Sequence, residues 1–524
     1  MRIKEQLQHI IKNSLKTLNI DKKLTEISLE ISKVPDCDYT SNISFSLTRE
    51  LHQKPEEIAN TLKNIIKDDI IENIEVTYPG TLNISLNRNY IINCISQIIE
   101  ENINYGKTNI GNNRNININF LNIIPTEELN SNYIRNVTYG DNLSRILKFI
   151  GFNVTKELYI KDTTQEINNL GHIIKENYQE LCNNNNNYNQ PLITKQLYNY
   201  YKDTKINEPE DYFKKEALSI LQDQLKKQLD TYRINFDIFT SEQSMYDKGL
   251  VDQVLDKLNK KGYTYFYEDA LWLKTSDSND DKDHILINND GTYTSLLPTI
   301  ANYINKIKDN YNGLININNI DKPNHIKSIK ASLEMLEKNK DILELKQVNN
   351  TTIVKDNKEI SNINLTELIN TLGINKTRYF FTSTSIDINM ELNIDQALSK
   401  TKENPIYYIE KTNATIYQIL KNYNQKITKV KSFSTIDNNL AYIIITKLYE
   451  FEDIVILSGL KQKPNIICDY LYELVTLFND YYKQEEIITK NETYTNERLN
   501  FLLAIKIVIN NALDLIGIIA REEL

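Results

Sequence analysis

The stretch PTEELNSNYIRNVTYGD, residues 125–141, lies between an apolar run at 116–124 and a set of apolar side chains at helical spacing. That set consists of Leu143, Ile146, Leu147 and Ile150, and it stops at Gly151. A second strand-like run covers residues 152–160. Strand, turn, helix and strand together predict a βαβ unit, and ligands bind at the turn after the first strand of such a unit. A site is therefore expected at residues 125–141.

The same stretch resembles the first signature of arginyl-tRNA synthetases, approximately PTGPLHVGHARGAVYGD, and aligns with it without a gap. Matching or nearly matching residues are Pro125, Thr126, Leu129, Arg135, Val137, Tyr139, Gly140 and Asp141. In that family, two histidines bind the triphosphate of ATP at a helix N-terminus. This chain has Asn130 and Tyr133 at those positions, and Asn132 replaces the glycine between them. Neither side chain carries a positive charge at neutral pH, so the resemblance implies that the electrostatic stabilisation of the transition state is missing.

Shorter matches extend the resemblance through nearly the whole chain. They are DYTSN at 38–42, KPEEIA at 54–59, PGTLNI at 79–84, ALWLKT at 270–275, DDKD at 280–283, ENPIYY at 403–408, YLYEL at 470–474 and ALDLIGI at 512–518. Their order and spacing imply an α/β fold with a class I synthetase, Rossmann-type catalytic core. An N-terminal α+β domain and a C-terminal α-helical bundle of the anticodon-binding type are implied on either side.

The pocket that would hold the amino acid also differs from the family pattern. Ile124 lies where the family has an asparagine that helps to hold the substrate. Thr299 and Asn302 occupy the positions of the aspartate and the tyrosine that recognise the arginine side chain. A guanidinium binds best to a charged, bidentate partner, and threonine cannot supply one.

Other expected site residues are charged. Lys355 and Lys358 lie in a segment that resembles the family's KMSKR loop, whose lysines neutralise phosphates, and Asp321 is the aspartate kept from its GADHH segment. A pair of lysines flanked by acids is also typical of a solvated turn. Arg135 and Asp162 are the polar residues of the substrate pocket that best match the family pattern, and both are also candidates for holding the fold.

Composition and periodicity predict the domain organisation. The chain has 524 residues, of which 40% are hydrophobic and 25% charged, as in ordinary globular proteins. We expect an N-terminal α+β domain at 1–108 with a helix at 58–66 and a strand-like run at 74–86, and a core at 109–389. A helical bundle is expected at 390–524, because Leu471, Leu474, Val475 and Phe478 share one helix face and a second helix stops at Gly517.

The net charge of −9 argues against a general nucleic-acid-binding protein but leaves room for a local basic patch that contacts tRNA. The best basic run consists of Lys421, Lys426, Lys429 and Lys431. Its alternative interpretation is a solvated lysine-rich edge.

Several site classes and locations are not indicated. The four cysteines and five histidines have no metal-ligand spacing, so neither a metal site nor a disulfide framework is expected. No run reaches the roughly 18 apolar residues of a membrane helix. We expect a cytoplasmic monomer without membrane contact.

Three functions follow from this pattern. The first is a catalytically impaired relative of arginyl-tRNA synthetase that binds tRNA or a protein partner. The second is an active arginine–tRNA ligase, with ATP as its cofactor, whose site has diverged. The third is a sensor or regulatory subunit whose pocket binds another small ligand.

Overall fold

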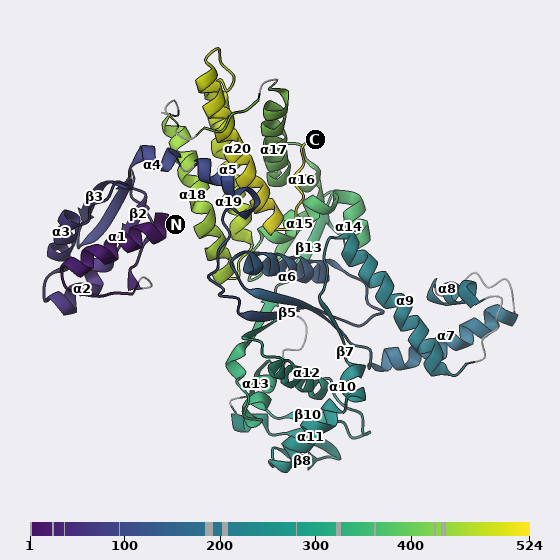
Figure 1. Ribbon diagram of the computed structural model, residues 1–524. Helices are drawn as coiled ribbons and strands as arrows, with labels where there is room; N and C mark the ends of the chain where they lie inside the picture. The colour runs from purple at the N-terminus through teal and green to yellow at the C-terminus, as the bar shows by residue number, and fades with distance from the viewer. Residues whose placement is uncertain are drawn as a thin grey trace.

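The computed structural model describes residues 3–523 except 24–25, 36, 94, 184–191, 202–207, 279, 321–325, 361–362, 424–425, 431–432, 434–435 and 437. An N-terminal α+β unit, an α/β core and a C-terminal helical bundle follow one another along the chain (Figure 1). This architecture confirms the predicted fold class.

The N-terminal unit is an antiparallel sheet covered by helices. Its strands are paired in the order β1-β2-β4-β3, and it connects to the bundle through α4 and α5. Its elements are α1 (Ile3–Thr17), β1 (Glu30–Ile31), β2 (Tyr39–Ser41), α2 (Ile43–Leu51), α3 (Pro55–Ile65), β3 (Ile71–Thr77), β4 (Thr81–Leu86), α4 (Arg88–Asn93), α5 (Ile95–Glu101) and the 3₁₀ turn η2 (Asn102–Asn104). The strand-like run expected at 74–86 is a hairpin, because Pro79 and Gly80 turn the chain between β3 and β4. Gly80 has φ +144°, and a Cβ there would lie 2.5 Å from the carbonyl carbon of Pro55.

The core contains, within the described residues, a parallel sheet in the order β12-β11-β5-β6-β7. Its strands are β5 (Asn115–Ile123), β6 (Asn153–Ile160), β7 (Ile238–Ser241), β11 (Gly313–Asn319) and β12 (Leu343–Val348). The helix α6 (Ser131–Phe149) packs on one face, and α12 (Leu296–Lys308) and α13 (Ile326–Met335) lie on the other (Figure 1). Side chains alternate between these faces. Thus Ile315 and Ile317 join the large apolar core around α6, whereas Leu314 joins a second core with α12.

Two insertions lie between strands of this sheet, one between β6 and β7 and one between β7 and β11. The first is a projecting helical arm with its own small apolar core, made of α7 (Gln165–Asn183), α8 (Leu192–Tyr201) and α9 (Glu210–Thr231). The second packs beside α12 and consists of α10 (Gln243–Asp247), α11 (Leu250–Lys260), β8 (Thr264–Tyr267), β9 (Ala270–Leu273), the 3₁₀ turn η3 (Thr275–Ser278) and β10 (His284–Ile287). A third 3₁₀ turn, η4 (Lys340–Ile342), leads into β12.

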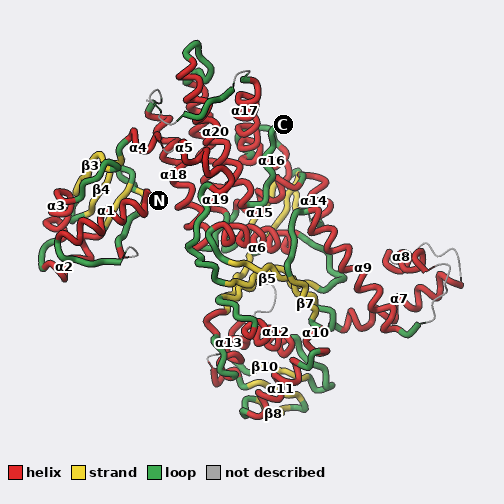
Figure 2. Tube along the Cα trace, viewed as in Figure 1, coloured by secondary structure: helices red, strands yellow, loops and turns green. Residues whose placement is uncertain are grey.

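A small sheet and short helices join the core to the bundle. They are β13 (Thr351–Lys355), β14 (Lys358–Glu359), α14 (Leu365–Leu372), α15 (Ile374–Ser383), β15 (Met390–Asn393) and α16 (Ile394–Leu398). The bundle, shown in red at the top of Figure 2, contains α17 (Pro405–Asn422), α18 (Asn439–Leu460), α19 (Asn465–Gln484) and α20 (Glu492–Leu515). The apolar face predicted around Leu471 is buried on α19, and α20 ends two residues before Gly517. Among the described helices, none combines the length and apolar character needed to cross a membrane.

Candidate active site

The turn between β5 and α6 lies where the sequence predicts the site, and Asn130 closes the first turn of α6. Its Oδ1 accepts hydrogen bonds from the backbone N–H groups of Asn132 at 3.1 Å and of Tyr133 at 3.2 Å. Its carbonyl accepts from Ile134 N at 2.9 Å. Free amides at a helix N-terminus are the groups that bind phosphate. Here the side chain of Asn130 accepts hydrogen bonds from two of these amides, those of Asn132 and Tyr133.

Carboxylates flank the same turn. The hydroxyl of Tyr133 donates to Glu127 Oε2 at 2.5 Å, and the backbone N–H of Ile124 donates to the same oxygen at 3.0 Å. Burial is the main cause that raises the pKa of Tyr133 above its ordinary value. The carboxylate of Glu127 raises this pKa further, so the phenol stays protonated. Glu128 adds a second acid, with its Oε2 3.5 Å from Asn364 Nδ2. An anion that approached this helix end would meet the carboxylates of Glu127 and Glu128.

The turn is also joined to the segment that follows the sheet. Asn132 Oδ1 accepts from the backbone N–H of Thr351 at 3.0 Å, which holds the first residue of β13 against α6. The backbone N–H of Leu365 donates to the carbonyl of Leu129 at 2.9 Å. The side chain at position 132 therefore fills the space beside the helix end.

Lys355 and Lys358 face each other across a tight hairpin. They are paired residues of β13 and β14, and the two residues between them, Asp356 and Asn357, have φ angles of 50° and 57°. Such left-handed pairs form two-residue hairpin turns. All four residues are exposed, and the backbone N–H of Asp356 donates to Asp395 Oδ2 at 2.7 Å. The structure thus places both lysines at the tip of a short, exposed hairpin.

A cavity of about 120 Å³ lies between the sheet and α12, toward the carboxyl ends of the strands. It contains Thr299 and Asn302, so the structure brings these two predicted positions together. Ile124 is not among its lining residues, which are Asn119, Asn122, Tyr159, Lys161, Ser295, Thr299, Asn302, Tyr303, Asn316, Asn318, Ile326, Ile329 and Leu345. Carboxamides and hydroxyls dominate this lining, and within the described residues it contains no carboxylate.

The amides from β5 and β11 form a connected row. Asn122 Nδ2 donates to Asn318 Oδ1 at 2.8 Å, and Asn119 Nδ2 donates to Asn122 Oδ1 at 3.1 Å. The family pattern does not single out these asparagines. The alternation of Ile and Asn at 115–119 and at 315–318 is the signal that could have found them, because residues two apart share one face of a strand.

The side chains of Arg135 and Asp162 are both buried, and both form hydrogen bonds with other residues of the chain. The guanidinium of Arg135 is fully buried and donates to the carbonyls of Asn349 at 2.7 Å and Ser385 at 2.8 Å, among others. Burial lowers the pKa of Arg135 to about 10. Asp162 accepts from Ser241 Oγ at 2.5 Å and from the backbone N–H of Gln243 at 2.8 Å. Neither residue is among those that line the cavity.

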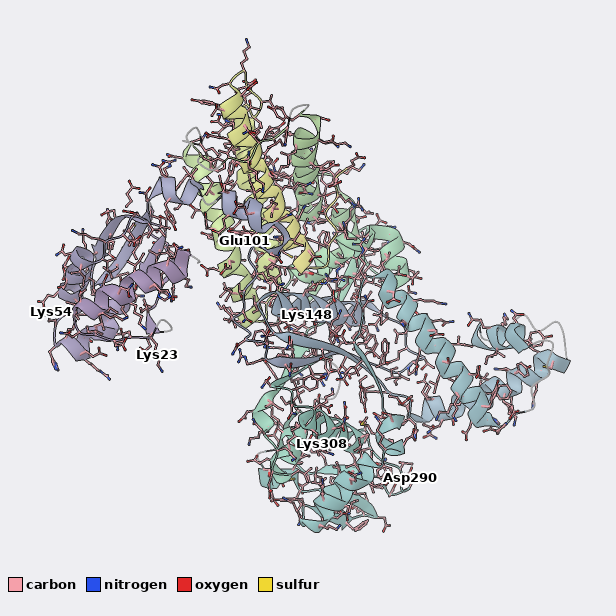
Figure 3. All side chains as sticks on the ribbon, viewed as in Figure 1. Lys23, Lys54, Glu101, Lys148, Asp290 and Lys308 are labelled. Carbon is pink, nitrogen blue, oxygen red and sulfur yellow. The ribbon has the colours of Figure 1, made fainter. Side chains whose placement is uncertain are left out.

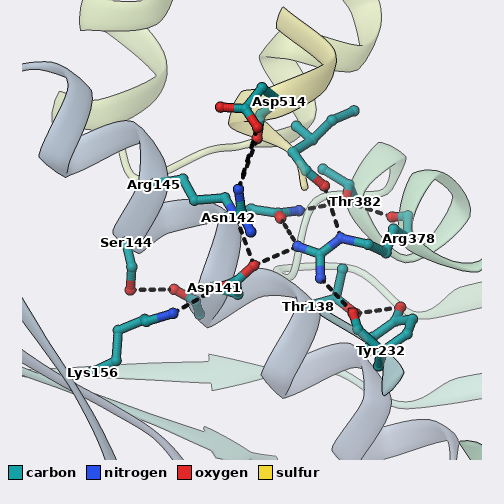
Figure 4. Close-up of polar contacts among 12 residues, drawn as sticks. Thr138, Asp141, Asn142, Ser144, Arg145, Lys156, Tyr232, Arg378, Thr382 and Asp514 are labelled. Atoms are coloured by element: carbon teal, nitrogen blue, oxygen red, sulfur yellow. Dashed lines mark hydrogen bonds and ion pairs between the residues drawn. The ribbon is translucent and has the colours of Figure 1, made fainter. Parts of the chain in front are cut away.

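On α6, the carboxylate of Asp141 contacts three cationic side chains (Figure 4). Its carboxylate lies 2.6 Å from Arg378 Nη2, 2.9 Å from Arg145 Nε and 3.1 Å from Lys156 Nζ. Burial opposes ionisation of Asp141, but the charges of Arg378, Arg145 and Lys156 outweigh it and lower the pKa to about 2. This cluster joins α6 to α15 and, through Arg378 Nε and the carbonyl of Ile516 at 3.1 Å, to the end of α20.

The predicted basic run lies at the end of α17 and just after it. Lys421 Nζ is 3.3 Å from Glu523 Oε1, and Lys426 and Lys429 are exposed. Lys431 and Asp321 lie outside the described residues. Within the part of the chain that is described, no group of three or more His, Cys, Asp or Glu side chains is placed to bind a metal ion.

Comparison with known proteins gives matches along the whole chain. Residues 5–86 match the arginyl tRNA synthetase N terminal domain, and residues 409–524 match the DALR anticodon binding domain. The chain is similar to arginine–tRNA ligases of Staphylococcus epidermidis, with 31% identity over 100% of this chain and 99% of the relative, and of Bacillus subtilis, with 30% identity over 100% of both.

Solved structures give the same result for the fold. Arginyl-tRNA synthetase of Thermus thermophilus superimposes with a TM-score of 0.76 at 17% identity and covers 100% of both chains. The synthetase of Plasmodium falciparum also gives 0.76, at 16% identity, over 100% of this chain and 99% of the other.

Proposed function

This chain belongs to the arginyl-tRNA synthetase family, and we propose that it is a member that binds tRNA but has lost most or all of the capacity to attach arginine. The observation that carries the proposal is the closed N-terminus of α6. Asn130 occupies its amides, and Glu127 and Glu128 place negative charge beside it. A triphosphate carries several negative charges, so each of these features opposes its binding.

The chemistry of the cavity supports the same proposal. Thr299 Oγ1 donates to the carbonyl of Ser295 at 2.6 Å, and no carboxylate joins it in the described lining. A guanidinium in this cavity would lose its hydration without gaining an ionic partner. Removing one preorganised electrostatic contact costs about 10² to 10³ in rate. Several such contacts are absent here, so we expect turnover at least about 10⁴-fold below that of an active relative.

Binding of tRNA is proposed from the two domain matches and the exposed lysines. The matched segments lie within the first and third of the domains that we propose, at 1–108, 109–389 and 390–524. Lys426 and Lys429 are exposed in the segment that follows α17, where they are accessible to the phosphates of an RNA.

Arginylation of total tRNA tests the proposal directly. The protein, at micromolar concentration, is incubated with ATP, labelled arginine and tRNA, and the Bacillus subtilis relative serves as the positive control. We expect no charging above background and a gel shift of tRNA without ATP. Charging within about tenfold of the relative would refute the loss of catalysis. Absence of any shift would refute tRNA binding and would favour a protein partner.

An active ligase is the second candidate, and one observation favours it. The relatives that match at 30–31% identity over the full length are named arginine–tRNA ligases. If this candidate is correct, Asn130→Ala should change the rate of charging and ATP should bind measurably. In the proposed function, the same variant changes only the stability of α6.

A further inference from the structure

A groove of about 860 Å³ lies between the N-terminal unit and the bundle. One wall comes from β3, β4 and α4, and the other comes from α18 and α19 (Figure 1). Two contacts join the walls: the hydroxyl of Tyr442 donates to Asp38 Oδ1 at 3.4 Å, and Arg88 Nη2 donates to Asn439 Oδ1 at 3.1 Å. The volume is near the upper end of the range for ligand sites, which is roughly 300–1,000 Å³.

The lining of the groove is acidic on both walls. Asp38 and Glu72 belong to the N-terminal unit, whereas Glu450 and Glu473 belong to the bundle. Lys447 is shared between two of these acids, because its Nζ lies 3.0 Å from Glu450 Oε2 and 2.6 Å from Glu473 Oε2. Four acids and two cationic side chains give the described lining a formal charge of −2. This charge disfavours an RNA phosphate and favours a cationic partner.

Exposed apolar side chains line the same groove. Ile443 on α18 is 49% exposed, and Tyr472 on α19 is 37% exposed. Apolar surface flanked by acids complements a segment that carries large apolar side chains beside lysine or arginine. A small amine would neutralise some of the acids but would cover little of the apolar surface.

A recess of about 10 Å³ adjoins the groove and shares Asp38 and Glu450 with it. Tyr449 also lines the recess, and its hydroxyl is buried without a hydrogen-bond partner among the described residues. A recess of this size holds about one water-sized group, such as an ammonium group. Burial raises the pKa of Asp38 and that of Glu450 above their ordinary values, so a further cation would stabilise each carboxylate. The recess therefore fits the end of a lysine side chain.

We propose that this groove binds an amphipathic, lysine-bearing segment of a partner protein. The apolar side chains of the segment pack on Ile443 and Tyr472, and one lysine places its ammonium group in the recess beside Tyr449. Further cationic side chains lie near Glu72 and Glu473. The proposal goes beyond the proposed function and is independent of it, because the groove shares no lining residue with the cavity between the sheet and α12.

Fluorescence anisotropy of the full chain with a labelled synthetic peptide, without ATP or RNA, tests the assignment. The peptide has about 14 residues, with leucines at helical spacing on one face and lysines beside them. We expect a Kd of about 100 μM or lower. Two control peptides should bind at least about tenfold more weakly: one has glutamate in place of lysine, and the other has the same composition in scrambled order.

Three variants of the groove should weaken binding of the lysine peptide. Glu72→Lys reverses an acid of the lining and should raise the Kd about fivefold or more. Ile443→Ser removes apolar contact and should raise it about tenfold. Tyr449→Phe removes only the hydroxyl in the recess and should raise it about threefold.

Control variants make the same changes outside the groove. Glu75→Lys reverses an exposed acid on the same strand, β3, and Glu101→Lys reverses one at the end of α5 (Figure 3). Leu460→Ser shortens an apolar side chain that is 56% exposed on α18. All three should leave the Kd unchanged, and circular dichroism spectra matching that of the wild type show that the variants are folded.

Several outcomes would overturn the assignment. They are no saturable binding at about 1 mM peptide, equal affinities for the lysine peptide and its scrambled form, and equal Kd values in the groove variants and their controls. Spermidine that displaces the peptide at an equal concentration, with the same response to Glu72→Lys, would indicate a site for small amines and would overturn it as well. None of these measurements involves tRNA or arginine, so failure of this proposal is distinguishable from failure of the proposed function.

Discussion

Arg378 Nη2 lies 2.6 Å from Asp141 Oδ2, and neither side chain is exposed to solvent. The two residues are 237 positions apart and connect α15 to α6. Arg378 also donates to Asn142 Oδ1 at 2.7 Å and to the carbonyls of Tyr232 and Ile516, each at 3.1 Å. One guanidinium therefore joins the core, the base of the helical arm and the end of the bundle.

Removal of the Arg378 side chain should destabilise the chain strongly. Arg378→Met leaves Asp141 buried with fewer cations and leaves two carbonyls without a donor, so we expect a loss of about 3–5 kcal/mol. Asp514→Asn is the control, because Asp514 is exposed and lies 3.6 Å from Arg145 Nη1. Its loss should cost at most about 1 kcal/mol. Urea unfolding followed by far-ultraviolet circular dichroism measures both changes, and equal costs would contradict the central role of Arg378.

Asp141 should also make stability depend on pH in the acid range. Its pKa is lowered to about 2 in the folded chain, below the ordinary value of 3.8. Because the folded pKa is the lower one, the stabilisation is present above pH 4 and is lost as the pH falls from about 4 to about 2. The difference corresponds to about 2 kcal/mol.

This dependence can be isolated with Asp141→Asn. The variant is less stable at pH 7, but the gap between it and the wild type should narrow steadily as the pH falls from about 4 to about 2. Thermal unfolding at several pH values gives the comparison. A gap of constant size across this range would show that Asp141 does not titrate with a lowered pKa.

Gly517 is needed for the close approach of Arg378. It has φ +67°, and a Cβ at this position would lie 2.1 Å from Arg378 Nη2. Gly517→Ala should therefore displace the guanidinium and cost more than the roughly 1–2 kcal/mol of left-handed backbone strain. Gly249 offers a matched position, because it has φ +63° and no atom lies within 4 Å of its ideal Cβ. Equal effects of Gly517→Ala and Gly249→Ala on the unfolding midpoint would show that contact with Arg378 is unimportant.

The cap formed by Asn130 should contribute to stability in its own right. Asn130→Ala leaves the N–H groups of Asn132 and Tyr133 without their acceptor, and we expect a loss of about 1 kcal/mol. Asn130→Ser keeps a side-chain acceptor and should lose much less. Urea unfolding distinguishes the two variants. If alanine and serine behave alike, the hydrogen bonds of the cap do not contribute measurably.

Local patterns in the sequence predicted the βαβ unit and the bundle, since strand and helix periods are properties of neighbouring residues. The resemblance assigned Thr299 and Asn302 to the positions that recognise the substrate side chain, and both line the cavity between the sheet and α12. The contact between Arg378 and Gly517 could not be predicted, because it depends on how two distant helices pack. The capping role of Asn130 could have been predicted, because asparagine is a preferred N-cap residue and this one directly precedes α6.

Lys426 and Lys429 should contribute to the salt dependence of the affinity for tRNA. If both lysines contact phosphates, the plot of log affinity against log salt should become shallower by about 1.5 in Lys426→Gln/Lys429→Gln. Lys308→Gln/Lys338→Gln makes the same change in net charge at two exposed lysines of the core and should leave the slope unaltered. Gel shift or fluorescence anisotropy between about 50 and 200 mM salt measures both slopes. If the two double variants change the slope equally, only the total charge matters, and the lysines after α17 form a solvated edge rather than an RNA contact.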